Sequence, residues 1–313
     1  MSRFKVVVSD QVFPSVEIER ALLASIDAEL VVATGDSAQV LAVARDADAI
    51  LNTYLPWPAE TLAGLEKCRI IARYGIGVDN VDLDAARSAG IVVTNVPDYS
   101  VEEVATHTLA LILALLRKLF AADRLVREGG WAIKSLQPIR RLSELTVGLF
   151  GYGRIARKLA DPLRALGVEI VVHDPYVQPG PGIPELLTLE ELLARADIVS
   201  IHAPLTAETR GIIGTSALSA VKPGAMLVNT SRGPLVDLEA LIEALADARL
   251  GAAALDVFDR EPLDHARIED VPNLIVTPHM AYYSEESLQE SQRKAATQVI
   301  KVLTGQEPDY RVN

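Results

Sequence analysis

The sequence has 313 residues, of which 50% are hydrophobic, with a formal net charge of −12 and one cysteine, Cys68. This length allows two domains with hydrophobic cores of their own, and the acidic balance argues against nucleic-acid binding, which needs a basic face. A lone cysteine excludes an intrachain disulfide, and no apolar run reaches the roughly 18 residues of a membrane span, so we expect a cytoplasmic protein without a membrane partner.

Residues 1–98 alternate between strand and helix patterns. The strand patterns cover residues 5–9, 29–33, 49–52, 69–73 and 91–94, and the helical patterns cover residues 16–24, 37–44, 58–65 and 83–89. Because the first strand pattern follows directly after Arg3, we expect no signal peptide. Such alternation predicts a parallel sheet covered by helices.

One long helical pattern, residues 101–128, interrupts this alternation. Ser100 and Glu103 have the spacing of a helix-capping pair, and Gly129 and Gly130 mark the end of the helix. The interior of the pattern is apolar, which predicts that the helix is buried, partly against another subunit. Residues 131–143 follow as an arm without a clear period.

A second alternation begins at residues 146–150. Further strand patterns cover residues 169–173, 198–202, 226–229, 252–256 and 274–277, and helical patterns cover residues 156–165, 189–195 and 238–246, with a last helix at 285–303. Most of these strands end in polar residues or in a glycine or proline turn. Because ligands of doubly wound sheets bind at the carboxyl ends of the strands, we expect a site there.

A glycine motif follows the strand at 146–150. Gly151 allows a tight turn, Gly153 allows a pyrophosphate to approach the backbone, and Ala156 lets the next helix pack closely on the sheet. Asp174 follows the next strand, roughly 20 residues after the first glycine, as expected of a carboxylate that binds an adenosine ribose. No arginine follows nearby to bind a 2′-phosphate, so the motif predicts a dinucleotide site that prefers NAD to NADP.

Three further residues have side chains suited to reduction of a 2-keto acid. The Arg232 guanidinium matches a carboxylate, His279 is suited to donate a proton, and Glu261 is suited to fix the tautomer of that histidine and raise its pKa. Each alone is equally consistent with an ordinary role: a surface arginine, a structural histidine, a solvated loop carboxylate.

Several motifs occur together in one order. They are RYGIGVDN at 73–80, VP at 96–97, HAPLT at 202–206, NTSRG at 229–233, ALDV at 254–257, EP at 261–262 and PH at 278–279. Over essentially the whole chain this set resembles the D-isomer-specific 2-hydroxyacid dehydrogenase family. Within the family, HMAYYS at 279–284 is most similar to the C-terminal binding protein branch and its bacterial relatives, close to the phosphoglycerate dehydrogenases.

The resemblance implies a fold and a set of functional residues. The fold is α/β, with a flavodoxin-like substrate domain (1–98 plus 283–313), an inserted NAD-binding Rossmann domain (99–282) and a cleft between them. Arg232, Glu261 and His279 match the catalytic residues. The backbone of Ile76 and Gly77 and the side chains of Tyr54, Tyr99 and Tyr282 are expected at the substrate, whereas no metal is expected. The cofactor residues are Gly151, Gly153, Arg154, Ile155, Asp174, Thr108, His202, Pro204, Thr206, Thr230 and Asp256.

The resemblance also implies a homodimer formed by the long helix and the arm. The loop at 52–57 is aromatic and uncharged, whereas phosphoglycerate dehydrogenases have arginines there, so an unphosphorylated substrate is expected unless Lys134, Arg140 or Arg141 reach in from the arm. Tyr54 and Trp57 are then candidates to line the pocket, or they are ordinary packing residues. The alternative to an enzyme is an NADH-responsive, corepressor-like binding protein.

Overall fold

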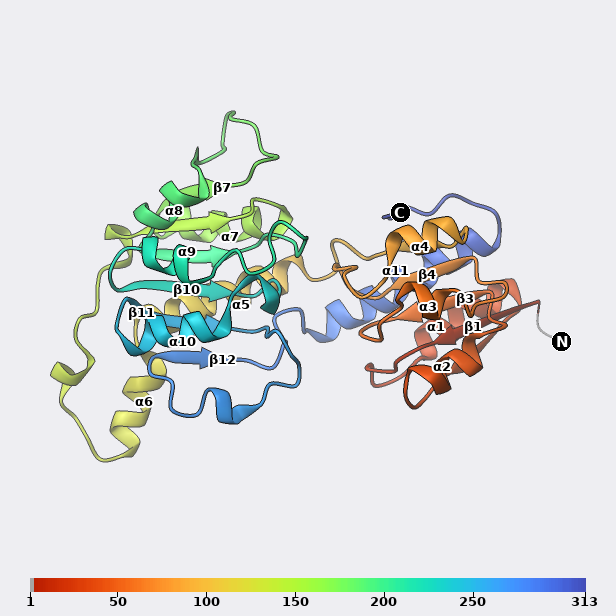
Figure 1. The fold of residues 1–313 in the computed structure, drawn as a ribbon, viewed down its shortest axis with the longest axis horizontal. Coiled ribbons are helices and arrows are strands. Elements are labelled where there is room, and N and C mark those ends of the chain that lie inside the picture. Colours follow the sequence, from red (N-terminus) through yellow and green to blue (C-terminus); the bar gives the residue numbers. More distant parts are fainter. Residues whose placement is uncertain (1–2) are drawn as a thin grey trace. The chain divides into compact units, whose positions relative to one another are not determined.

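The computed structural model describes residues 3–313, which form two compact units that each contain one parallel sheet (Figure 1). One unit comprises residues up to Ser100 together with Tyr283–Asn313, and the other comprises Val101–Tyr282. Met1 and Ser2, which the predicted first domain includes, lie outside the described residues. The predicted fold class, two parallel-sheet α/β units, is confirmed.

The first unit has a five-stranded sheet with the order β2-β1-β3-β4-β5, which is the flavodoxin-like order. Its strands are rich in branched apolar residues, and most of their side chains are buried, as in a sheet covered on both faces. The strands are β1 (Phe4–Val8), β2 (Ala28–Val32), β3 (Ala49–Asn52), β4 (Ile70–Arg73) and β5 (Val92–Thr94).

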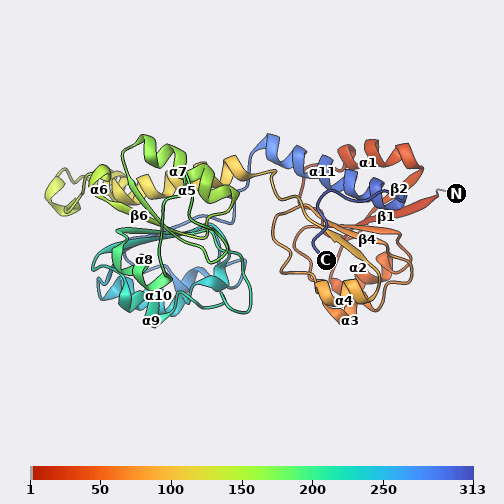
Figure 2. The same cartoon turned by 90° about the horizontal axis from the view of Figure 1, so that it is seen from above.

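Helices cover both faces of this sheet. Figure 2 shows α1 (Glu17–Leu23) and α11 (Glu285–Leu303) on one face, and α2 (Ser37–Ala44), α3 (Ala59–Leu62) and α4 (Leu83–Ser88) on the other. A short 3₁₀ helix, Ala24–Ile26, follows α1. The chain end is fixed on β5, because the Asn313 side chain accepts the Val93 backbone N–H at 2.8 Å.

The second unit has a seven-stranded sheet with the order β12-β11-β10-β9-β6-β7-β8. Counted from its own first strand this is the doubly wound Rossmann order, extended by one strand. The strands are β6 (Thr146–Phe150), β7 (Glu169–His173), β8 (Glu185–Leu186), β9 (Ile198–Ile201), β10 (Ala225–Asn229), β11 (Leu250–Leu255) and β12 (Leu274–Val276).

Two hydrophobic cores lie on the two faces of this sheet. On one face α5 (Val101–Leu116) and α7 (Arg154–Ala165) pack against the strands, and on the other face α8 (Leu189–Arg195), α9 (Thr215–Ala220) and α10 (Leu238–Ala246) do so (Figure 2). Close packing requires small residues in the sheet: a Cβ on Gly148 would lie 2.8 Å from side-chain atoms of Leu192 and Ala196.

The prediction of one helix over residues 101–128 is wrong. The helix ends at Leu116, and a second helix, α6 (Leu119–Arg127), begins after Lys118, whose φ of 52° is left-handed. The charged pair Arg117 and Lys118 interrupts the apolar face at this point. The predicted cap is also wrong, because within residues 3–313 the buried Ser100 hydroxyl has no hydrogen-bond partner.

The second unit also contains the arm and several short 3₁₀ helices. Residues 131–143, predicted without a period, contain the short 3₁₀ helix Ile133–Leu136 and reach another, Leu142–Glu144; two more are Gly233–Leu235 and His265–Arg267. β8 and α9, which are only two and six residues long, were not predicted from the sequence. Within the described part of the chain, no helix has the length and apolar character needed to cross a membrane.

Candidate active site

The predicted site residues of the second unit lie where its strands end. Gly151 follows β6, Asp174 follows β7, His202 follows β9, Thr230 follows β10 and Asp256 follows β11. Because all these strands are parallel, their carboxyl ends form a single edge of the sheet. The fold therefore brings to one edge residues that are far apart in the sequence.

The turn between β6 and α7 has the geometry of an anion-binding site. Gly151 has a φ of +92°, and a Cβ there would lie 2.7 Å from the backbone of His202. Gly153 is the N-cap of α7, has no side chain to occupy the first-turn N–H groups, and would meet no heavy atom within 4 Å if it carried a Cβ. The free N–H groups and open space fit a dinucleotide pyrophosphate. Arg154 and Ile155 begin the helix beside this space.

Asp174 lies beside the glycine turn and is held by backbone hydrogen bonds. Its Oδ2 accepts the Tyr152 N–H at 2.8 Å, and its Oδ1 accepts the Tyr176 N–H at 2.9 Å. Each carboxylate oxygen retains a lone pair, so Asp174 can still accept from ribose hydroxyls. No lysine or arginine occurs in residues 175–194, so the sequence next to Asp174 supplies no cation for a 2′-phosphate.

The remaining predicted cofactor neighbours lie along the same edge. Thr108 on α5 and Thr230 are buried, and their hydroxyl oxygens are 2.8 Å apart. Pro204 and Thr206 are exposed in the loop after β9. His202 lies 2.9 Å from the Ser200 hydroxyl, and desolvation lowers the pKa of this histidine to about 4, so the imidazole is neutral at pH 7.

His279 and Glu261 form a short hydrogen bond at this edge. His279 Nδ1 and Glu261 Oε2 are 2.6 Å apart, and Glu261 Oε1 accepts the Phe258 N–H at 2.9 Å. Because an ionised carboxylate can only accept, the proton of His279 is on Nδ1 and its Nε2 is the atom that exchanges a proton. The Tyr282 ring lies edge-on to the imidazole, with centroids 6.0 Å apart.

Burial alone would raise the pKa of Glu261. The hydrogen bond from His279, the His279 charge, the Phe258 N–H and the Arg232 charge outweigh it, so the pKa of Glu261 lies below its usual range. Glu261 is therefore a carboxylate at neutral pH.

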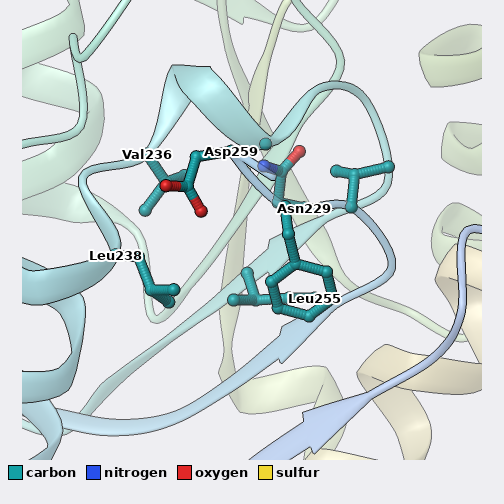
Figure 3. A pocket seen from close by; sticks show the side chains of 8 residues that line it. Asn229, Val236, Leu238, Leu255 and Asp259 are labelled. Carbon is teal, nitrogen blue, oxygen red and sulfur yellow. The ribbon is translucent and has the colours of Figure 1, made fainter. Parts of the chain in front are cut away.

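Gly233 brings the Arg232 loop close to the loop that contains Glu261. A Cβ on Gly233 would collide with the backbone of Phe258, so the two loops touch directly. Asn229 braces the turn, since its Nδ2 donates to Arg232 O at 2.8 Å and its Oδ1 accepts the Ser231 N–H at 3.0 Å. A small pocket with room for about one water lies behind these loops (Figure 3). Asn229 and Asp259 are its polar lining residues.

Asp256 holds the loop that carries His279, a role that the sequence analysis missed. This carboxylate is fully buried and accepts from Thr277 Oγ1 at 2.5 Å and from the Met280 and Ala281 N–H groups at 2.9 Å. The His279 N–H donates to Asp256 O at 2.8 Å, and the φ of His279 is 52°. The predicted contact of Asp256 with a nicotinamide carboxamide would have to use the one acceptor position that these bonds leave.

His107 extends this support from α5. Its Nε2 lies 3.2 Å from Thr277 Oγ1 and 3.7 Å from Asp256 Oδ1. Because Thr277 gives its hydroxyl proton to Asp256, it accepts the hydrogen bond from His107. The only signal in the sequence was a polar residue within a largely apolar helix, which is too weak to identify such a contact.

In the first unit, Ile76 and Gly77 follow β4. Their carbonyl groups accept from Asn95 Nδ2 and Arg73 Nη1, whereas neither backbone N–H donates a hydrogen bond within residues 3–313. These two N–H groups are thus available to an anion. Tyr54 is 46% exposed and Tyr99 is half-buried.

The structure bears on two points about the substrate that the sequence left open. Trp57 is fully buried in the core between the sheet and α2–α4, so it packs rather than lines a pocket. Arg140 donates to Asp197 at 2.8 Å, and Asp197 precedes β9, at the opposite edge of its sheet from the site. Arg140 is therefore not a phosphate ligand at that edge.

Comparisons with known proteins agree with this geometry. Residues 109–281 match the family model described as D-isomer specific 2-hydroxyacid dehydrogenase, NAD binding domain. A D-3-phosphoglycerate dehydrogenase of Mycobacterium tuberculosis is 40% identical over 276 residues, which cover 87% of this chain and 52% of the relative. The chain spans about half the length of the curated relatives it matches.

Two solved structures share the fold. A D-lactate dehydrogenase from Aquifex aeolicus, complexed with NAD and lactic acid, has a TM-score of 0.88 at 28% identity, over 96% of each chain. A glyoxylate reductase from Paecilomyes thermophila has a TM-score of 0.91 at 26% identity, over 100% of this chain and 99% of that one. All three are named as enzymes, and they lend no support to the alternative of an NADH-responsive binding protein.

Proposed function

Because the chain belongs to the D-isomer-specific 2-hydroxyacid dehydrogenase family, we propose that it is an NAD-dependent oxidoreductase. It interconverts a small, unphosphorylated D-2-hydroxy acid and its 2-keto acid. The observation that carries this proposal is the 2.6 Å pair of His279 Nδ1 and Glu261 Oε2, with the Arg232 loop packed against it through Gly233.

The three side chains divide the work of carbonyl reduction. When bound, the reduced nicotinamide supplies the hydride that the substrate carbon accepts. His279 Nε2 gives the carbonyl oxygen its proton, and Glu261 stabilises the protonated imidazole and keeps it oriented. Arg232, which stays charged, binds the substrate carboxylate and polarises the carbonyl. In the oxidation direction His279 takes the hydroxyl proton instead.

The cofactor residues favour NAD. The pyrophosphate binds at the Gly151–Gly153 turn and the first turn of α7, and Asp174 accepts from both ribose hydroxyls. A 2′-phosphate would meet the Asp174 carboxylate at this position and would find no cation in residues 175–194. Because the phosphate and the carboxylate are both negative, they repel each other, and NADPH is the poorer cofactor.

In this proposal both units contribute residues that bind the substrate, and the second unit binds the cofactor. The free N–H groups of Ile76 and Gly77 bind the substrate carboxylate, and Tyr54, Tyr99 and Tyr282 contact the rest of the molecule. The loop at 52–57 has no lysine or arginine, which disfavours a phosphorylated substrate. The names of the phosphoglycerate dehydrogenases therefore do not fix the substrate of this chain.

We also propose a homodimer in the cytoplasm. The dimer is supported by large apolar side chains that are exposed on α6 and the arm: Leu119, Phe120, Val126, Trp131 and Ile133. The cytoplasm suits a chain whose one cysteine is unreactive, because burial raises the pKa of the Cys68 thiol to about 12.

The test is oxidation of NADH, with NADPH in parallel, against glyoxylate, pyruvate, hydroxypyruvate, 3-phosphohydroxypyruvate and a longer apolar keto acid. We expect turnover of an unphosphorylated acid with NADH. His279→Ala and Arg232→Ala should each lower kcat/KM by roughly 10²-fold or more. Both variants should keep the wild-type affinity for NADH, measured by fluorescence titration.

His265→Ala is the matched control, because His265 is exposed in the same unit and should retain full activity. Loss of NADH binding in both active-site variants would contradict the assigned roles. Preferred turnover of the phosphorylated acid would contradict the proposed substrate class.

A further inference from the structure

Asp10 lies just after β1 and accepts hydrogen bonds from five donors. Four of these donors belong to residues 52–55, at the end of β3 and in the loop that follows it. Its Oδ1 accepts from Ser9 Oγ (2.6 Å), Asn52 Nδ2 (3.2 Å) and the Thr53 N–H (2.9 Å), and its Oδ2 accepts from the N–H groups of Tyr54 and Leu55. One side chain thus binds the backbone of three consecutive residues. We propose that Asp10 is a positioning residue for substrate recognition, an inference that rests on the function proposed above.

The physical reason lies in the backbone of this loop. Thr53, Tyr54 and Leu55 lie beyond the end of β3, and the Asp10 carboxylate accepts all three of their N–H groups. Without this carboxylate the three N–H groups would need water as an acceptor. A water molecule can accept a hydrogen bond from an N–H group in many positions, whereas a fixed carboxylate permits one. Tyr54 is 46% exposed, and the Asp10 carboxylate fixes the position of its backbone N–H.

The same network reaches the second loop that we assign to the substrate. Arg73, which is 6% exposed, donates to Asn52 Oδ1 at 3.2 Å and to the carbonyl groups of Thr53 and Gly77. Asn80 Nδ2 donates to Asn52 Oδ1 at 2.9 Å and to Leu55 O at 3.0 Å. The backbones at 53–55 and 76–77 are therefore parts of one polar network.

This coupling predicts an effect on substrate affinity. If the loop at 53–55 shifts, Arg73 and Asn80 shift with it, and the Ile76 and Gly77 N–H groups lose their alignment with the substrate carboxylate. Loss of a hydrogen bond to a charged group such as this carboxylate weakens binding by roughly 10-fold to 10²-fold. The predicted cofactor residues belong to the other unit.

The test compares Asp10→Asn with Asp48→Asn in the full chain. An amide has one oxygen, so Asp10→Asn must place an NH₂ group against N–H donors at one of the two oxygen positions. Asp48 is a matched carboxylate at the opposite edge of the same sheet, where its Oδ2 accepts the Lys5 N–H at 2.8 Å. Both variants remove a charge that accepts from the backbone, but only Asp10 contacts the substrate loop.

We expect Asp10→Asn to raise KM for the keto acid by roughly 10-fold to 10²-fold, with NADH affinity unchanged and a smaller effect on kcat. The Thr53, Tyr54 and Leu55 amides should exchange hydrogen faster than in the wild type. Asp48→Asn should leave KM and these three amides unchanged. If Asp10→Asn does not fold, Ser9→Ala, which removes one donor to Asp10, should raise KM in the same direction by less.

Two outcomes overturn the inference. The first is an unchanged KM in Asp10→Asn. The second is a rise in KM of the same size in Asp10→Asn and Asp48→Asn that follows the loss of stability in each variant. Absence of keto-acid turnover in the wild type would instead contradict the proposed function. In that case the exchange rates of the three amides still decide whether Asp10 orders the loop.

Discussion

Gly153 and Gly233 lack side chains for different physical reasons. At Gly153 an added methyl group would enter open space in front of the helix N-terminus, where the pyrophosphate binds in our proposal. Gly153→Ala should therefore change the free energy of unfolding by no more than about 1 kcal/mol and weaken NADH binding strongly. Titration of NADH fluorescence together with urea denaturation separates the two effects.

Gly233→Ala serves as the opposite case in the same measurements. Its methyl group would collide with the Phe258 backbone, and such overpacking costs about 1–3 kcal/mol of stability. Turnover should fall as the Arg232 and Glu261 loops separate, whereas NADH affinity should change little. Normal NADH affinity in Gly153→Ala would show that the cofactor does not approach that turn.

His202 makes stability depend on pH. An unfolded histidine takes up a proton below about pH 6.5, whereas folded His202 stays neutral down to about pH 4. Between these values the unfolded state binds more protons, so the free energy of unfolding decreases as the pH falls. His202→Gln should remove this part of the dependence, which is at most about 1.4 kcal/mol per pH unit.

Urea denaturation at several pH values between about 4.5 and 7.5 checks this prediction. His265→Gln is the control, because it removes an exposed histidine from the same unit, and its curve should run parallel to that of the wild type. A His202→Gln curve parallel to the wild type would mean that this imidazole is protonated in the folded chain.

At the scale of elements, the sequence predicts best those segments whose pattern is decided locally. The strands at 49–52, 146–150 and 169–173 and the helices at 37–44, 189–195 and 285–303 have the predicted bounds. All six segments have an apolar pattern, and each of the three helices also begins with a capping box. Such signals are contained in a few neighbouring residues, so they can be recognised without the fold.

The elements and contacts that were missed depend on distant residues. β8 is two residues long and exists because it pairs with β7. Likewise, Asp10 and His107 act on residues far along the chain, at 52–55 and 277, that only the fold brings near. The end of α5 is an exception, because it depends on the left-handed φ of the nearby Lys118. The sequence indicates the glycine turn because its motif is local, and it indicates Arg232, Glu261 and His279 because their motifs match a family; these assignments stay predictions.

At the scale of the whole molecule, the exposed apolar side chains of α6 and the arm are the observation that supports the proposed homodimer. The apolar side chains of α5 were expected to be buried, partly against a partner, and Leu111, Ile112 and Leu115 pack within their own unit. By contrast, no residue of α6 is buried, and Phe120, Trp131 and Ile133 are 60%, 83% and 69% exposed. Exposed apolar residues gathered in this way mark a protein interface.

The double variant Phe120→Glu/Ile133→Glu should therefore be a monomer. A specific interface buries about 1,000 Å² or more of surface, and burial of two unpaired charges per protomer opposes the association of the two protomers. Light scattering should give the wild type twice the 33.7 kDa chain mass and the variant the mass of one chain. Leu166→Glu, at an exposed apolar residue that ends α7, should stay dimeric. A dimeric double variant would place the interface elsewhere, and a monomeric wild type would contradict the proposed assembly itself.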